Sequence, residues 1–203
     1  MKTAAQRASG TVRRKQIKRA TLEIISEEGM KKLSTKNLAD HVHLSEGAIF
    51  RHFHSKSEII LSIIDDVKSD LLKPLQEIAG KPVSPDKRLE EFMCFHVSYL
   101  KQNSGVTILL FTEAAYQNND MLKKQLNELF WLIKQYFGKI VHDGIATGLW
   151  DSDISVDTIS SLYIGIPITM SIEMSLVPDV FSYKNFCGQM LRLVSRLLHD
   201  KKV

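Results

Sequence analysis

Apolar residues recur at the spacing of an α-helix along almost the whole chain, and no stretch alternates strictly between apolar and polar positions as a half-buried strand would. Three helices are expected first, over residues 12–28, 35–40 and 46–53. In the first of these, Ile17, Ala20 and Ile24 form one apolar stripe, and Gly29 follows the expected C-cap. The pattern therefore predicts an all-α fold that opens with a three-helix module.

Hydroxyl side chains mark where the next helices begin. Ser34 or Thr35 can cap the second helix and Ser45 the third, because a hydroxyl oxygen accepts a hydrogen bond from a free backbone N–H of the first turn. Ser55 followed by Glu58 has the spacing of a capping box, which predicts a longer helix over residues 56–78. Pro74 is expected to kink this helix near its end.

Breaker residues divide the rest of the chain. A loop is expected over residues 80–85, and Pro178 is expected to separate the last two helices. Pro167 should kink its helix without ending it, because apolar residues continue on both sides. The predicted helices cover residues 86–103, 106–116, 120–147, 154–175 and 181–199, about nine in all. The expected domains are residues 1–56 and residues 57–203, the second beginning with a connecting helix over 57–78.

The composition is that of a folded protein without a membrane span. Of 203 residues 44% are apolar and 25% charged, and no run approaches the ~18–20 apolar residues that a spanning helix requires. Residues 1–10 are too polar for a signal peptide, so a cytoplasmic location is expected. Cys94 and Cys187 are expected to be small apolar residues in a reducing compartment and not disulfide partners.

Charge is distributed unequally along the chain. Residues 1–56 hold 12 Lys and Arg against 5 Asp and Glu, a net charge of +7, whereas the remaining 147 residues hold 15 against 18, a net charge of −3. A basic segment attracts polyanions, which makes nucleic acid the first candidate partner. The alternative is a solvated basic face without a partner.

Two short helices joined by a tight turn and bordered by basic residues are typical of a DNA-binding helix-turn-helix. The major groove of B-DNA is about 12 Å wide and admits one α-helix. His41, His43, His52 and His54 lie close together in the same segment, but no Cys is near and no four-ligand set is defined. Neither a metal nor a cofactor is expected.

The run LSEGAIFRHFHSKSEII over residues 44–60 resembles the recognition helix and following linker of the TetR/AcrR-like family of transcriptional regulators. The run STKNLAD over residues 34–40 is similar to the start of the second helix in that family. The match extends over residues 14–60, and its combined spacing is specific. The resemblance implies a larger helical domain for ligand binding and dimerisation after the helix-turn-helix.

The resemblance also implies roles for individual residues. Phosphate contacts are expected from Thr35, Lys36 and Lys56, and Arg51 suits a bidentate contact with guanine. Ile49 and Phe53 are expected in the core. The alternative for each contact is an ordinary exposed helix residue. The residues expected to face the groove are Ser45, Glu46, Gly47, Ala48, Phe50 and Arg51.

Three residues depart from the pattern of the family. His43 occupies a turn position that is usually Gly, where a positive φ costs a side chain some strain. Phe50 replaces a common Tyr and lacks its hydroxyl, and Glu46 replaces a frequent Lys. The operator sequence therefore cannot be derived from the family.

For the larger domain, the resemblance implies a homodimer interface on the last two helices and a ligand cavity among the middle ones. In both cases the alternative is packing inside one chain. The expected interface residues are Leu162, Ile166, Met174, Phe186, Met190, Leu193 and Leu197. The expected ligand-binding residues are Phe92, Phe95, Tyr99, Phe111, Trp131 and Met170.

Together these features predict a repressor that binds a palindromic double-stranded operator as a homodimer and is released by a small, largely apolar effector. An activator and an effector-independent DNA-binding protein of the same fold are the alternatives. An enzyme is not expected, because Glu113, His142 and Asp143 belong to no recognised catalytic pattern.

Overall fold

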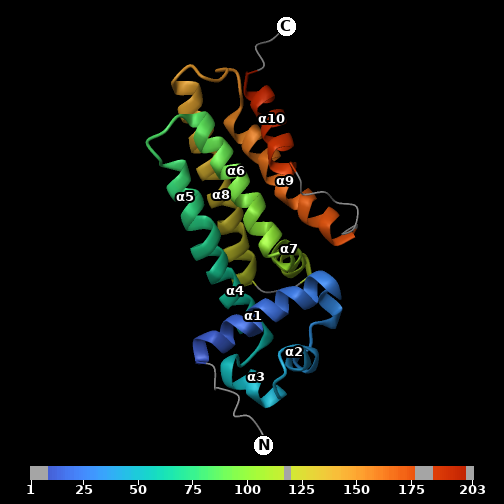
Figure 1. Ribbon diagram of the computed structural model, residues 1–203. Coiled ribbons are helices and arrows are strands. Elements are labelled where there is room, and N and C mark those ends of the chain that lie inside the picture. Colours follow the sequence, from blue (N-terminus) through green and yellow to red (C-terminus); the bar gives the residue numbers. More distant parts are fainter. Residues whose placement is uncertain (1–8, 117–119, 177–184, 200–203) are drawn as a thin grey trace, which may run out of the picture. The chain divides into compact units, whose positions relative to one another are not determined.

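The computed structural model describes residues 9–116, 120–176 and 185–199. These residues form helices and no strand, so the predicted all-α class is confirmed. The chain divides into two compact units, Met1–Asp65 and Asp66–Val203 (Figure 1). This division lies inside a helix, nine residues beyond the boundary expected after residue 56.

The first unit is built from α1 (Gly10–Glu27), the 3₁₀ turn η1 (Met30–Lys32), α2 (Thr35–His41), α3 (Glu46–His52) and the beginning of α4 (Lys56–Val67). The three-helix module is therefore present as expected. Its core consists of apolar side chains at most 2% exposed, which come from every α-helix of the unit: Ile17, Ile24, Leu38, Ile49, Phe53 and Ile60.

Serine caps fix the beginning of each of the first three helices. The side chains of Ser9, Ser34 and Ser45 accept hydrogen bonds from the backbone N–H groups three residues later, at 3.4, 3.1 and 3.2 Å. Gly29, at φ 86°, follows the C-cap of α1 in a conformation that costs a residue with a Cβ several tenths of a kcal/mol or more.

The predicted helix over residues 56–78 is present as three consecutive helical segments. α4 is followed by a π-type turn, η2 (Lys68–Leu72), and then by α5 (Lys73–Ala79), which carries Pro74 in its first turn. Proline has no backbone N–H to donate to the preceding turn, so the hydrogen-bond register changes just before it. The helical run continues past Pro74 because proline is tolerated in the first turn of a helix.

The second unit contains α6 (Pro85–Gln102), α7 (Gly105–Tyr116), α8 (Asp120–Ala146), α9 (Val156–Leu176) and α10 (Phe186–His199). With α4, η2 and α5 counted as one run, the described chain has the nine helices expected. Figure 1 shows α5, α6 and α8 alongside one another, while α9 packs on α8 and α10 on α6. Phe92, Phe137 and Tyr163 bring α6, α8 and α9 together in the core, with the rings of Phe137 and Tyr163 stacked 4.2 Å apart.

The last two helices differ from their predicted bounds. α9 continues through Pro167, as expected, but α10 begins at Phe186 after Asn185 at φ 80°. Positive φ interrupts a right-handed helix. The expected start at residue 181 and the expected break at Pro178 lie outside the described residues.

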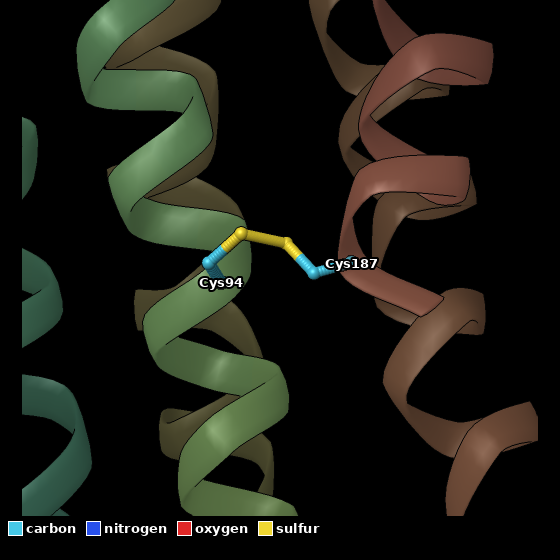
Figure 2. Close-up of a disulfide and its surroundings, with 2 residues drawn as sticks. All are labelled: Cys94 and Cys187. Atoms are coloured by element: carbon cyan, nitrogen blue, oxygen red, sulfur yellow. A yellow bond between two sulfur atoms is a disulfide. The ribbon is translucent and has the colours of Figure 1, made fainter. Parts of the chain in front are cut away.

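A disulfide links Cys94 of α6 to Cys187 of α10, with 5.4 Å between their Cα atoms (Figure 2). The expectation of two free cysteines is therefore wrong. The residues are 93 positions apart in the sequence, and only the packing of α10 on α6 brings them together.

Among the residues that the structure describes, no helix is both long enough and apolar enough to cross a membrane.

Candidate functional site

The turn between α2 and α3 has the geometry of a helix-turn-helix. The N–H of Leu44 donates to the carbonyl of Ala39 at 2.9 Å, and the N–H of His43 donates to that of Asp40 at 3.2 Å. His43 has φ 53°, the left-handed conformation anticipated at this position. A side chain therefore occupies a turn that favours glycine.

Helix α3 and its N-cap present one exposed face to solvent. Ser45, Glu46, Gly47 and Arg51 are exposed, and Phe50 is 48% exposed. Phe50 is thus a large apolar ring on the outer face of a short helix, an arrangement suited to contact with a partner.

Ala48 does not belong to that face. Its side chain is 7% exposed and is buried beside the core residue Ile49, which lies on the inner side of α3. The prediction that Ala48 faces the groove is therefore not matched by its position. A period of 3.6 residues places Ala48 on the side of α3 opposite Phe50, and Ile49 on the side opposite Arg51.

Three of the expected DNA contacts meet in one hollow. Thr35 of α2, Phe50 of α3 and Lys56 of α4 all line it, together with residues of the core. Lys36, next to Thr35, is exposed. The structure therefore brings a hydroxyl, an aromatic ring and an ammonium group together from three helices.

Arg14 holds these helices in place, although nothing in the sequence distinguishes it from the other basic residues of α1. Its guanidinium lies 3.9 Å from the ring centroid of Phe53 and 3.2 Å from Glu58, and it donates to the carbonyl oxygen of His52. Arg14 therefore connects α1 to the end of α3 and the beginning of α4.

Glu58 completes this arrangement. Its N–H donates to the Ser55 hydroxyl at 3.1 Å, and its carboxylate accepts from the N–H of His54 at 2.7 Å. A regular capping box would bond the N–H of Ser55 instead. The backbone N–H of His54 and, to a smaller extent, Arg14 hold the pKa of Glu58 below its ordinary value, so this carboxylate stays charged.

Two acidic residues, Glu23 in α1 and Glu28 at its C-cap, anchor α2. The amide of Asn37 donates to Glu28 at 3.2 Å, and a ring nitrogen of His41 lies 3.2 Å from Glu23. The described residues contain no group of three side chains that could bind a metal ion, and His41 of the histidine-rich segment has this carboxylate partner.

The second unit contains a small apolar pocket with an interior volume of about 60 Å³. It lies among residues of α4, η2, α6, α7, α8 and α9, and no charged side chain of the described chain lines it. Its lining consists of Val67, Leu71, His96, Leu100, Val106, Thr107, Leu110, Phe111, Leu126, Leu129, Phe130, Ile133, Ile164, Pro167 and Ile168.

Of the expected ligand-binding residues, Phe111 lines this pocket, whereas the other five lie elsewhere in the described structure. Phe92 and Met170 are fully buried in the core, and Trp131 is 57% exposed on α8. Phe95 and Tyr99 are partly buried on α6. The expectation relied on aromatic residues, but aliphatic side chains supply most of the lining.

A buried polar pair lies at the pocket wall. Nδ1 of His96 is 2.8 Å from the hydroxyl of Tyr163, and both residues are less than 5% exposed. Burial lowers the pKa of His96 to about 4 and raises that of Tyr163, so both side chains are neutral near pH 7.

A largely apolar groove, with Arg196 and His199 also in its wall, lies between α9 and α10. Its wall includes five of the seven expected interface residues, and Leu162, Leu193 and Leu197 are each about half exposed. Met174 and Phe186, the other two, are partly buried outside the groove.

The comparisons with known proteins agree on the fold. Residues 17–63 match the model described as bacterial regulatory proteins, tetR family. The chain is 27% identical over 132 residues to the nucleoid occlusion factor SlmA of Aliivibrio fischeri, covering 64% of this chain and 67% of that protein.

Two solved structures are similar over nearly the whole chain. The regulator MbdR from Azoarcus sp. CIB has a TM-score of 0.77 at 17% identity, covering 96% of this chain and 100% of that one. The transcriptional regulator FadR from Bacillus subtilis, in complex with stearoyl-CoA, has a TM-score of 0.72 at 19% identity, covering 91% and 99%.

Proposed function

Because this chain belongs to the TetR/AcrR family of bacterial regulators, we propose that it is a repressor that binds a palindromic operator as a homodimer and is released by a small, largely apolar effector. The observation that carries the proposal is the joint placement of Thr35, Phe50 and Lys56 around one hollow of a helix-turn-helix unit. Regulation of transcription through DNA is its function, and the cytoplasm is its proposed place of action.

The contacts divide by chemistry. Thr35, Lys36 and Lys56 bind phosphates and set the register, while the outer face of α3 enters the major groove. Arg51 donates to guanine, and Phe50 packs against a thymine methyl group. Lys36 and Arg51 form no ion pair with any described residue, so DNA binding breaks no such pair at these two positions.

A second copy of the chain covers the groove between α9 and α10. Leaving three half-exposed leucines of this face in water costs free energy. In a two-fold symmetric dimer the same face of each copy would bury the leucines of the other. Replacing Leu193 with Glu should produce monomers in light scattering after size exclusion, whereas Lys124→Glu, on exposed α8 surface, should leave the dimer intact.

The effector occupies the apolar pocket. One helix, α4, carries Lys56 at its first residue and Val67, which lines the pocket, at its last. A ligand that prefers one conformation of this helix lowers DNA affinity by the coupling free energy, typically about 1–3 kcal/mol.

The test of the DNA-binding proposal is fluorescence anisotropy with the DNA upstream of the chain's own gene, across a series of salt concentrations. Arg51→Ala should weaken binding and relax sequence preference, and Lys36→Ala should reduce the slope of log affinity against log salt by about 1. Arg19→Ala is the matched control, because Arg19 also lies in the first unit but pairs with Glu23 on the outside of α1. Equal effects of all three substitutions would refute the proposed surface.

A second function is favoured by one observation, the similarity to SlmA, whose name describes a nucleoid occlusion factor. In that case the chain binds many chromosomal sites without an effector. Sequencing the DNA recovered with the protein from cells distinguishes the two. A few sites near promoters support the repressor, whereas many dispersed sites support the second function. An activator is distinguished from a repressor by whether transcripts of the regulated genes fall or rise when the gene for this chain is deleted.

A further inference from the structure

The histidine at the pocket wall is fixed in one tautomer by its neighbour. The hydroxyl of Tyr163 is buried, and its one hydrogen-bond partner among the described residues is Nδ1 of His96. A buried phenol must donate its proton to avoid the cost of an unsatisfied O–H. Nδ1 is therefore the acceptor, and the ring proton of the neutral imidazole is on Nε2.

The Nε2–H group has no partner in the described structure. The side chain of His96 makes no hydrogen bond with the described residues other than the one with Tyr163, and its Nε2 atom retains some accessible surface. His96 itself is 4% exposed and lines the pocket. Leaving an N–H donor unpaired in an apolar pocket costs free energy. A ligand with an oxygen that accepts this hydrogen bond is therefore favoured over a ligand without one.

The other polar group of the wall is already occupied. The hydroxyl of Ser171 donates its one proton to the carbonyl of Pro167 at 2.9 Å, so it accepts from the hydroxyl of Thr107, which lies 3.0 Å away. All remaining lining residues are apolar. A carboxylate or phosphate placed here would lose its hydration without a cationic partner.

We propose that this pocket selects an uncharged, mostly hydrocarbon ligand with one carbonyl or hydroxyl oxygen, which accepts a hydrogen bond from Nε2–H of His96. The inference rests on the proposed effector-binding function and specifies its ligand class. Tyr163 acts as a positioning residue, because it fixes the tautomer without touching the ligand. Burial keeps the pKa of His96 near 4, so no positive charge is present to attract an anion.

The test compares three ligands of equal chain length, 2-decanone, decane and decanoate, in competition with the uncharged dye Nile red on the full-length protein. The ketone should bind roughly tenfold more tightly than the hydrocarbon, as expected for one hydrogen bond inside a dry pocket. Decanoate should bind most weakly. Tighter binding of decanoate than of the ketone would overturn the proposal.

The double variant His96→Leu/Tyr163→Phe removes both members of the pair and leaves no buried polar group unpaired, so it should remain folded. It should bind decane as the wild type does and lose the preference for the ketone. The infrared carbonyl stretch of bound 2-decanone should lie at lower frequency in the wild type than in this variant. Equal frequencies would refute the hydrogen bond.

Nitrogen NMR of the histidine side chains tests the tautomer without any ligand. A protonated Nε2 at His96 is expected, and a protonated Nδ1 would overturn the assignment. If the ketone and decane bind equally, the ligand class is wrong but an apolar effector pocket remains. If none of the three ligands displaces the dye, the effector-binding function itself fails.

Discussion

Single residues in the first unit illustrate how one side chain can organise a binding surface. Arg14 combines a cation–π contact, an ion pair and a hydrogen bond to a backbone carbonyl, and each reaches a different residue. None of these contacts can be inferred from the sequence, because Arg14 lies 38 and 44 positions from His52 and Glu58. Its four basic neighbours in α1 looked equivalent to it.

We predict that Arg14→Ala lowers the free energy of unfolding by about 1–3 kcal/mol, because all three contacts are lost and the ion pair between Arg14 and Glu58 is only partly exposed. Arg14→Lys should recover little, since an ammonium group lacks the planar fork. Chemical denaturation of the full chain measures this. Arg13→Ala is the control, as Arg13 bonds only Gln16 within the described residues, and a loss as large as that of Arg14→Ala would contradict the role.

His96 gives a prediction for pH. Burial lowers its folded-state pKa from 6.5 to about 4, so the unfolded chain binds more protons between these values and stability falls as the pH decreases through this window. The contribution is complete above pH 6.5, and its loss amounts to at most about 3 kcal/mol near pH 4. Urea midpoints at several pH values should show a smaller decrease for His96→Gln. Identical profiles for the two proteins would be inconsistent with a buried neutral histidine.

At the scale of elements, the contact between α8 and the following turn depends on a glycine, Gly144, whose lack of a side chain leaves room for Trp150. A Cβ on Gly144 would lie 2.1 Å from the Trp150 ring, which is buried. We predict that Gly144→Ala costs about 1–3 kcal/mol, because the indole must move. Gly165→Ala, in α9 with no atom within 4 Å of the new Cβ, should instead stabilise by several tenths of a kcal/mol or more. Fluorescence-detected unfolding measures both, and equal effects would argue against the contact.

The helices also show which structural features could be predicted from the sequence and which could not. Caps at Ser34 and Ser45 and the positive φ at His43 were predictable because each depends on residues within a few positions. The π-type turn before Pro74 was not, because a proline indicates a kink but does not say which hydrogen-bond register the preceding turn takes. The expected ligand-binding residues were aromatic apart from Met170, whereas the pocket is lined mostly by aliphatic residues from helices far apart in the sequence, such as Leu71 and Ile133.

At the scale of the whole molecule, the disulfide between α6 and α10 is the main departure from expectation. Cysteine spacing carries no pairing information when 93 positions separate the partners. In the cytoplasm, the proposed place of action, disulfides are usually transient or redox-sensing, so both the oxidised and the reduced chain matter for the proposed function.

We predict that reduction lowers the free energy of unfolding by about 2–4 kcal/mol, because the long loop regains conformational freedom in the unfolded chain. Urea midpoints with and without a phosphine reductant measure the change. Cys94→Ala/Cys187→Ala is the control and should not respond to the reductant. A wild-type midpoint that reduction leaves in place would rule out this stabilisation.

The same bond has a topological consequence. It closes residues 94–187 into a covalent ring that contains α7, α8 and α9, and it ties α10 to the chain from which it comes. Two copies therefore cannot exchange α10, the simplest route to a domain-swapped dimer, until the sulfur atoms separate. Any dimer that oxidised protein forms through the groove between α9 and α10 joins two intact protomers, which can dissociate and reassociate without unfolding.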